Sequence, residues 1–240
     1  MLIKTLRKIM KHITKKACPI KQIKKDYNKQ HVPSTYKNTK RAAVAYRENE
    51  EAILKGNIPE KYRRIIPYVP GKKILEIGAA EGVLSLLLSK DKEMVYGLDI
   101  SPHRHELALK LQNAWLEQGY DVGRCKMLLG DLIDYIDLLK EVDTVVAVRV
   151  IYHFKEEIDV NWVFSEIGKH VKNVVLVGNE RKAKYFLEIS KDFHTSPVPY
   201  YYSTVEGMKH LLKSNGYNVT NVVDEGDPIV VGSKKLLRSA

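Results

Sequence analysis

One stretch decides the fold of this 240-residue chain: Lys73-Ile-Leu-Glu-Ile-Gly-Ala-Ala-Glu-Gly-Val-Leu-Ser85. It begins as a short apolar strand, turns at Gly78 and continues from Gly82 with the spacing of a helix. Gly78 lets the backbone turn tightly and approach a ligand, and Gly82 allows close passage where the helix begins. Because ligands of α/β sheets bind at the carboxyl ends of the strands, we expect a binding loop at this turn.

Short β-branched runs alternate with longer helical patterns from Gly71 onward, which is typical of a parallel sheet with crossover helices. The expected strands are Lys73–Ile77, Met94–Leu98, Lys126–Leu129, Thr144–Val148, Asn173–Val177, Tyr217–Val223 and Ile229–Gly232. The expected helices are 82–90, 102–118, 131–140, 156–170 and 204–215. No helix fits between the last two strands, so we expect them to form an antiparallel hairpin. The pattern predicts an α/β fold with a mostly parallel seven-stranded sheet.

A dinucleotide-binding enzyme is the first alternative for such a loop. Its fingerprint is Gly-x-Gly-x-x-Gly, with the amino end of a helix facing a pyrophosphate. This chain instead has Glu-x-Gly-x-x-x-Gly, and Glu81 stands at the helix start, where it would repel a pyrophosphate. The spacing therefore argues against a nicotinamide dinucleotide.

Acidic residues stand at or just after the ends of the first three strands, in order: Glu76, Asp99 and Asp131. A carboxylate after the second strand can accept the protons of both ribose hydroxyls. Any one of these acids could instead be a helix cap, and Asp131 is well placed to cap the helix that follows it. All three in register are much harder to attribute to coincidence.

The loop and its acids resemble those of the class I S-adenosylmethionine-dependent methyltransferases, over residues 60–232. The resemblance implies a Rossmann-like class I methyltransferase fold with S-adenosyl-L-methionine as cofactor and S-adenosyl-L-homocysteine as product. It assigns Glu76 to the amino-acid end of the cofactor, Asp99 to the ribose and Asp131 to the adenine amino group. The cofactor-binding residues expected in full are Glu76, Gly78, Ala79, Gly82, Asp99, Ile100, Asp131, Leu132 and Arg149.

Acceptor-facing residues in this family come chiefly from the loop after the fourth strand, here Arg149-Val-Ile-Tyr-His-Phe154. The cofactor supplies the leaving group, so the protein positions the acceptor and removes its proton. We expect Tyr152 and His153 to be catalytic, because histidine is a natural general base near neutral pH. The alternative is that the two side chains only pack over the cofactor. Arg149 is either an anion contact or part of a surface ion pair.

Two further segments are candidates for binding the acceptor. Asn179, Glu180 and Arg181 follow the fifth strand, although polar residues at a strand end are often only solvated. His194 and Tyr201 belong to a segment rich in proline and tyrosine, which suits a sugar or nucleobase face or else a packed covering loop. We expect no metal site, and Cys18 and Cys125 have no metal or disulfide spacing.

The net charge of +11 belongs to the amino-terminal part of the chain. Residues 1–41 hold 13 Lys or Arg and one acid, Asp26, whereas the remainder is nearly neutral. Apolar residues recur with helical spacing over residues 1–17, and the segment that follows is polar. We therefore divide the chain into a basic amphipathic arm and linker, 1–41, and a methyltransferase domain, 42–240, which opens with a helical stretch over 42–69.

Three partners are open for the arm. A basic helix with an apolar stripe suits an anionic membrane surface, the charge alone suits the phosphates of RNA, and the stripe could pack on the protein's own core or across a homodimer. The stripe favours the membrane over RNA. The cysteine usage fits a reducing cytoplasm, so we expect a cytoplasmic protein, peripheral at the inner face of the membrane.

These features together favour O-methylation of a hydroxyl on a small molecule or a membrane-associated glycan. The first alternative is an RNA methyltransferase that uses the arm as a phosphate tether. The second is a non-catalytic scaffold that keeps only the cofactor site.

Overall fold

The computed structural model describes residues 53, 57–151, 157–181 and 201–234. The chain divides into two compact units, Met1–Glu51 and Ala52–Ala240. The first unit, which contains the basic arm, lies outside the described residues.

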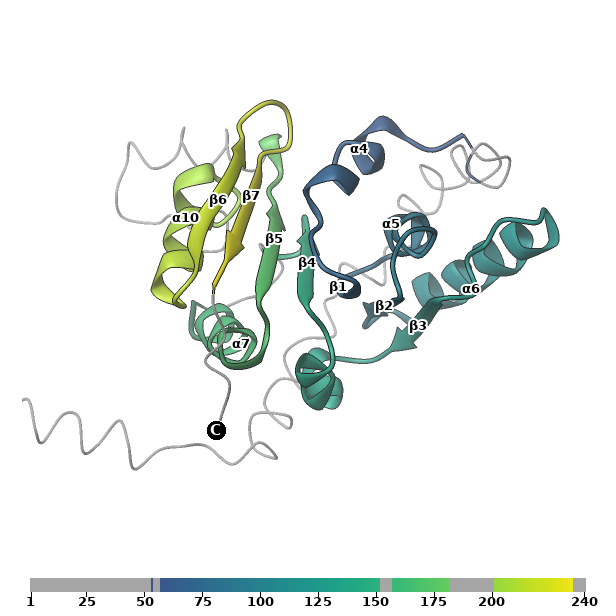
Figure 1. Cartoon of the computed structure of the whole chain (residues 1–240), viewed down its shortest axis with the longest axis horizontal. Helices are drawn as coiled ribbons and strands as arrows, with labels where there is room; N and C mark the ends of the chain where they lie inside the picture. The colour runs from purple at the N-terminus through teal and green to yellow at the C-terminus, as the bar shows by residue number, and fades with distance from the viewer. Residues whose placement is uncertain (1–52, 54–56, 152–156, 182–200, 235–240) are drawn as a thin grey trace, which may run out of the picture. The chain divides into compact units, whose positions relative to one another are not determined.

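A seven-stranded sheet forms the centre of the second unit (Figure 1). Its strands are β1 (Lys73–Ile77), β2 (Met94–Asp99), β3 (Cys125–Leu129), β4 (Thr144–Val148), β5 (Asn173–Val177), β6 (Asn218–Val223) and β7 (Ile229–Ser233). They lie in the order β3-β2-β1-β4-β5-β7-β6. The first five pair in parallel, whereas β7 is antiparallel to both β5 and β6. The expected sheet and its carboxy-terminal hairpin are confirmed.

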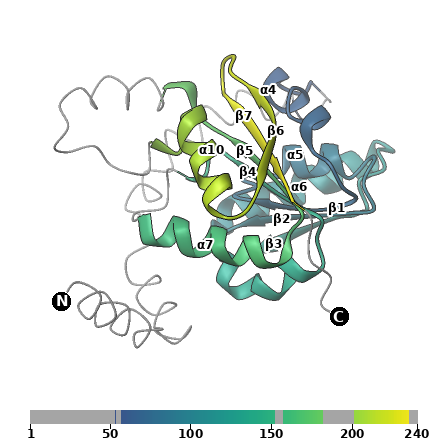
Figure 2. The same cartoon turned by 60° about the vertical axis from the view of Figure 1, so that its left-hand side comes forward.

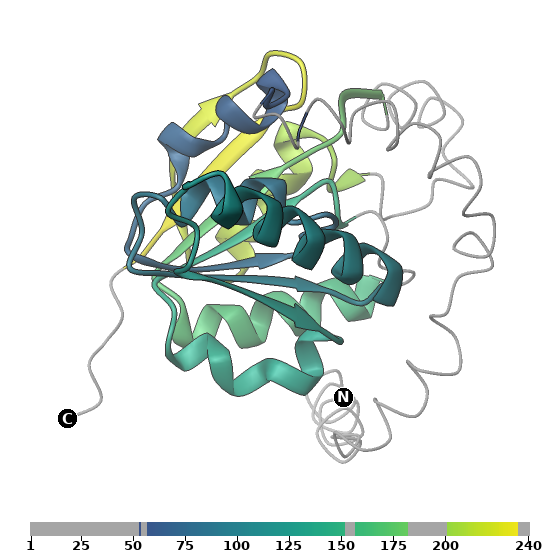
Figure 3. The same cartoon turned by 90° about the vertical axis from the view of Figure 1, so that its right-hand side faces the viewer.

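Helices cover both faces of the sheet (Figures 2 and 3). The helical elements are α4 (Glu60–Arg63), η2 (Ile66–Tyr68), α5 (Val83–Leu88), α6 (Pro102–Glu117), η3 (Leu132–Lys140), α7 (Glu157–His170) and α10 (Val205–Ser214). One core cluster joins the sheet to η2, α5 and α6, and a second joins it to η3, α7 and α10. The fold is therefore a doubly wound α/β sandwich.

Alternation along the buried strands feeds the two cores. In β5, Val174 and Leu176 belong to the α7 and α10 side, while Val175 and Val177 belong to the α5 and α6 side. All five residues of this strand are buried, as a parallel strand covered on both faces must be. Trp115 of α6 and Phe164 of α7 are the largest fully buried side chains, one on each side of the sheet.

Two helix predictions need correction. The helix expected over 42–69 is not continuous in its described part, because residues 57–59 are not helical and only α4 and η2 follow. Pro59 is the N-cap of α4 and Pro67 lies in η2, and each proline lacks the N–H that a continuous helix needs. The helix expected over 131–140 is the 3₁₀ element η3, which is interrupted by a kink at Tyr135.

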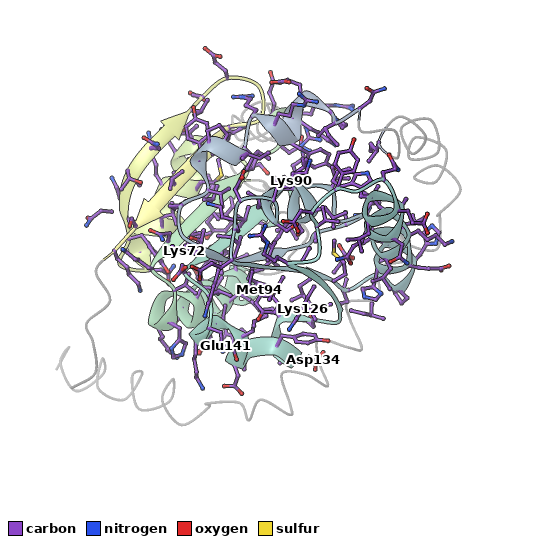
Figure 4. The ribbon with its side chains drawn as sticks, turned by 45° about the vertical axis from the view of Figure 1, so that its right-hand side comes forward. Lys72, Lys90, Met94, Lys126, Asp134 and Glu141 are labelled. Atoms are coloured by element: carbon purple, nitrogen blue, oxygen red, sulfur yellow. The ribbon has the colours of Figure 1, made fainter. Side chains whose placement is uncertain are left out.

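The parallel strands bring their carboxyl ends to one edge of the sheet. The loops that follow β1 to β5 meet there, and the β6–β7 turn joins them because β7 runs antiparallel to β5. Figure 4 labels Lys72, Met94 and Glu141, which stand at or just before the starts of β1, β2 and β4 and so mark the opposite, amino edge. Every candidate site residue that the structure describes belongs to the carboxyl side.

Candidate functional site

The loop after β1 adopts a backbone that requires small residues. Gly78, Ala80 and Gly82 have φ of 71°, 50° and 74°, in the left-handed region. A Cβ atom on Gly78 would lie 2.6 Å from Cγ2 of Val150, and one on Gly82 would overlap the methyl group of Met127. Both glycines therefore serve a tight turn and close packing, as expected. Ala80 is a strained non-glycine residue, a feature that is common at functional sites.

Glu76 is a buried carboxyl group at the end of β1. It is 3% exposed, and the hydroxyl of Ser85 donates a hydrogen bond of 2.5 Å to its Oε2. Burial raises the pKa of Glu76 to about 8, an effect that the bonds from Ser85 partly oppose. This carboxyl group is therefore largely protonated at neutral pH.

Asp99 ties the first two loops together at the end of β2. Its Oδ2 accepts the N–H of Ala80 at 2.8 Å, and its Oδ1 accepts the N–H of Ser101 at 2.8 Å. A carboxylate oxygen has two lone pairs, so each oxygen keeps capacity for a further donor such as a ribose hydroxyl. The neighbouring Ile100 exposes its side chain, which offers an apolar surface beside Asp99.

Asp131 is a helix cap, the role left open for it above. Its side chain accepts the N–H of Ile133 at 3.1 Å, and Asp134 completes a reciprocal capping box. Leu132 is buried in the core. Capping occupies only part of the carboxylate's capacity to accept hydrogen bonds, so the assignment of Asp131 to adenine stays a prediction.

Arg149 forms an ion pair, the second of its two expected alternatives. Its Nε lies 2.6 Å from Oδ2 of Asp227, which stands in the β6–β7 turn, and its Nη2 contacts the same oxygen. Oδ1 of Asp227 accepts the N–H of Glu180 at 3.1 Å. Asp227 thus links the loops after β4 and β5. Arg149 also has a left-handed φ of 52°, and its part in cofactor binding stays a prediction.

Lys61 and Tyr62 of α4 also lie near this site, and neither is among the residues expected there from the sequence. Burial and then the charges of Glu81 and Glu76 raise the pKa of Tyr62. Burial and then the charge of Arg149 lower the pKa of Lys61. Arg64 donates a hydrogen bond to the carbonyl of Glu225, which fixes α4 to the hairpin turn. No motif marks these residues, because only tertiary packing brings α4 to the loop.

The acceptor-side candidates are described only in part. Asn179 and Glu180 are half-buried and Arg181 is exposed, directly after β5. The ring of Tyr201 contacts those of Tyr202 and His210, with centroids 5.5 Å and 6.4 Å apart. Tyr152, His153 and His194 lie outside the described residues, so their expected roles are untested.

Neither a metal-binding cluster nor a membrane-spanning helix occurs in the part of the chain that the structure describes. No group of three or more His, Cys, Asp or Glu side chains in this part of the chain could hold a metal ion. None of the helices in the described ranges is long and apolar enough to cross a membrane.

Comparisons with known proteins agree with this geometry. A family model described as a methyltransferase domain matches residues 75–174, from β1 to β5. No curated protein matches the sequence significantly.

Solved structures share the fold at low sequence identity. Magnesium protoporphyrin IX methyltransferase from Synechocystis PCC 6803, with bound SAH, has a TM-score of 0.53 and 18% identity, covering 80% of this chain and 84% of that chain. A TehB-like SAM-dependent methyltransferase from Corynebacterium glutamicum has the same score and identity, covering 82% and 100%. A putative O-methyltransferase from Nostoc punctiforme has a TM-score of 0.50 and 15% identity, covering 71% and 54%.

The described residues share their α/β fold with solved structures of S-adenosylmethionine-dependent methyltransferases. Over residues 75–174 the chain is similar to the methyltransferase domain family. The subfamily and the acceptor are not assigned by the comparisons.

Proposed function

We propose that the protein transfers the methyl group of S-adenosylmethionine to a hydroxyl oxygen of a small molecule or a membrane-associated glycan. The observation that carries this proposal is the contact of Val150 with Gly78. It brings the start of the loop after β4 against the cofactor loop. The chain then continues through Ile151 into Tyr152 and His153.

In the proposed reaction, His153 accepts the proton of the acceptor hydroxyl. The oxygen attacks the methyl carbon in line with the sulfur, so an O–C bond forms while the S–C bond breaks. S-adenosylhomocysteine leaves as the neutral thioether, and the positive charge of the sulfonium ends as the proton on His153. The ion pair of Arg149 with Asp227 supports the role of His153 as the base, because Arg149 is the first residue of the loop after β4 and the ion pair holds it in place.

Label transfer into a cell extract tests the proposal without knowledge of the acceptor. The extract comes from cells that lack the protein, and radiolabelled S-adenosylmethionine supplies the methyl group. We expect label in saccharide or organic-extractable material. His153→Ala should lower the rate at least about 100-fold, the usual contribution of a general base. His170→Ala is the matched control, because His170 ends α7 at the amino edge of the sheet.

Other distributions of the label would redirect the assignment. Label in ribonuclease-sensitive material would favour the RNA methyltransferase, which the charge of residues 1–41 also suits. Cofactor binding without label in any fraction would favour the scaffold. An unchanged rate for His153→Ala would remove the histidine from the mechanism.

The membrane part of the proposal depends on residues 1–17. Their positive charge and apolar stripe would bind an anionic lipid surface and keep the enzyme near lipid-linked acceptors. A chain lacking residues 1–17 should lose most of its binding to vesicles of anionic lipid while its affinity for S-adenosylhomocysteine stays unchanged. Equal vesicle binding by the shortened and full chains would contradict the membrane assignment.

A further inference from the structure

Ser85 and Glu76 form a buried polar pair beneath the cofactor loop. Ser85 is fully buried in the first turn of α5, and its hydroxyl points at the carboxyl group of Glu76, with 2.5 Å between Oγ and Oε2. A buried polar group without a partner is destabilising, so each member of this pair holds the other in place.

Gly97 makes room for the pair on the neighbouring strand. It stands opposite Glu76 in the β1–β2 register. A Cβ atom on Gly97 would lie 2.8 Å from Oγ of Ser85 and 2.9 Å from the sulfur of Met127. Gly97 does not have the left-handed φ of the turn glycines, so close packing against Ser85 explains this glycine better than backbone conformation does.

We infer that Ser85 is a positioning residue for cofactor binding. Its hydroxyl packs against Gly97 and holds the carboxyl group of Glu76 toward the amino-acid end of the cofactor. The inference rests on the assignment of S-adenosylmethionine as cofactor and on the role expected for Glu76. Ser85 ends the stretch Lys73–Ser85, three residues after Gly82, and is not among the cofactor-binding residues expected from the sequence.

The charge state of Glu76 should make the affinity for the cofactor depend on pH. Ser85 of α5 lowers the pKa of Glu76 and Asp99 of β2 raises it. The charge of Glu76 in turn contributes to the raised pKa values of Tyr62 of α4 and Cys125 of β3. Burial raises the pKa of Glu76 to about 8, whereas a cationic ammonium group of the cofactor would favour the carboxylate. Binding should therefore release a proton, and the affinity should rise with pH up to about 8.

Removal of the Ser85 hydroxyl should move this pH profile in a defined direction. The hydrogen bond from Ser85 lowers the pKa of Glu76, so Ser85→Ala raises that pKa further. The rise in affinity then shifts to higher pH. A role limited to packing would leave the pH dependence where it is.

Calorimetric titration with S-adenosylhomocysteine between pH 6 and 9 is the test, with 5′-methylthioadenosine as the second probe because it lacks the amino-acid end. We expect Ser85→Ala to lower the affinity for S-adenosylhomocysteine about tenfold at pH 7. We also expect the profile to move to higher pH and the affinity for 5′-methylthioadenosine to stay within about twofold. Release of about one proton per S-adenosylhomocysteine bound is expected at pH 7 for the unaltered protein.

Two variants accompany Ser85→Ala. Ser89→Ala is the matched control, because Ser89 is also fully buried but donates to the carbonyl of Leu86 and does not contact Glu76. Gly97→Ala should displace the Ser85 hydroxyl without removing it. It should therefore also lower the affinity for S-adenosylhomocysteine, as Ser85→Ala does.

Wild-type affinity and pH profile in Ser85→Ala would overturn the inference. An equal loss for both probes would overturn it too, because it would indicate a general change of the site. If the unaltered protein bound neither probe, the cofactor assignment itself would fall and this inference with it.

Discussion

At the scale of single residues, the site depends on carboxyl groups whose environments differ. Glu76 is enclosed and shares a hydrogen bond with Ser85, so burial dominates and its pKa rises. Asp99 accepts two backbone N–H groups, from Ala80 and Ser101, and has no comparable side-chain partner among the described residues. Two acids at neighbouring strand ends therefore have different surroundings, and we expect Glu76 to serve the amino-acid end of the cofactor and Asp99 its ribose.

Replacement of Asp99 tests the ribose assignment. Asp99→Ala removes the expected acceptor of the ribose hydroxyls and the bond to the Ala80 N–H. We expect the affinity for S-adenosylhomocysteine to fall about 10- to 100-fold in a calorimetric titration. Asp121→Ala is the control, because Asp121 is exposed and pairs with Arg124 after α6, outside the loops of the site. Wild-type affinity in Asp99→Ala would refute the assignment.

Cys125 offers a second test at this scale. Burial raises the pKa of its thiol to about 12, so the thiolate, which is the reactive form, is scarce at pH 8. In a chain carrying Cys18→Ser, the remaining thiol should stay unmodified by a disulfide reagent at pH 8 while the protein is folded. It should react fully in denaturant. Rapid reaction of the folded protein would show that β3 opens readily.

At the scale of elements, the β6–β7 turn links several loops at the carboxyl edge of the sheet. Asp227 of this turn pairs with Arg149 after β4 and accepts the N–H of Glu180 after β5. The same turn receives a hydrogen bond from Arg64, just after α4. Segments far apart in sequence are therefore held together by one hairpin end.

Loss of the Asp227 carboxylate should loosen this arrangement. Asp227→Ala leaves Arg149 and the Glu180 N–H without their partner, and we expect the free energy of unfolding to fall by about 1 kcal/mol in denaturant titration, a modest value because Arg149 is partly exposed. Asp137→Ala removes an exposed pair with Lys140 and should not change stability measurably. Equal stabilities for the two variants would show that the Asp227 pair contributes nothing.

At the scale of the whole molecule, stability comes from two cores on opposite faces of one sheet. Phe164 of α7 is buried in one of them, against strands that alternate between the faces. A sheet covered on both sides needs every helix in place, because each apolar face would otherwise be open to water.

Truncation of Phe164 tests that core. Phe164→Ala should lower the free energy of unfolding by about 3–5 kcal/mol, the sum of lost burial and the cavity left behind. Leu116→Ala, on the exposed side of α6, should leave it almost unchanged. A small effect of Phe164→Ala would mean that α7 repacks to fill the cavity.

The seven strands, the final hairpin and the loop after β1 could all be predicted from the sequence. Local patterns suffice for these features, because burial on both faces imposes continuous apolar strands and the turn at Gly78 requires glycine. Three features could not be predicted from the sequence: the pairing of Arg149 with Asp227, the approach of α4 to Glu76 and Glu81, and the packing of Ser85 against Gly97. These contacts join residues from different elements, and no period or spacing along the chain encodes which elements will meet.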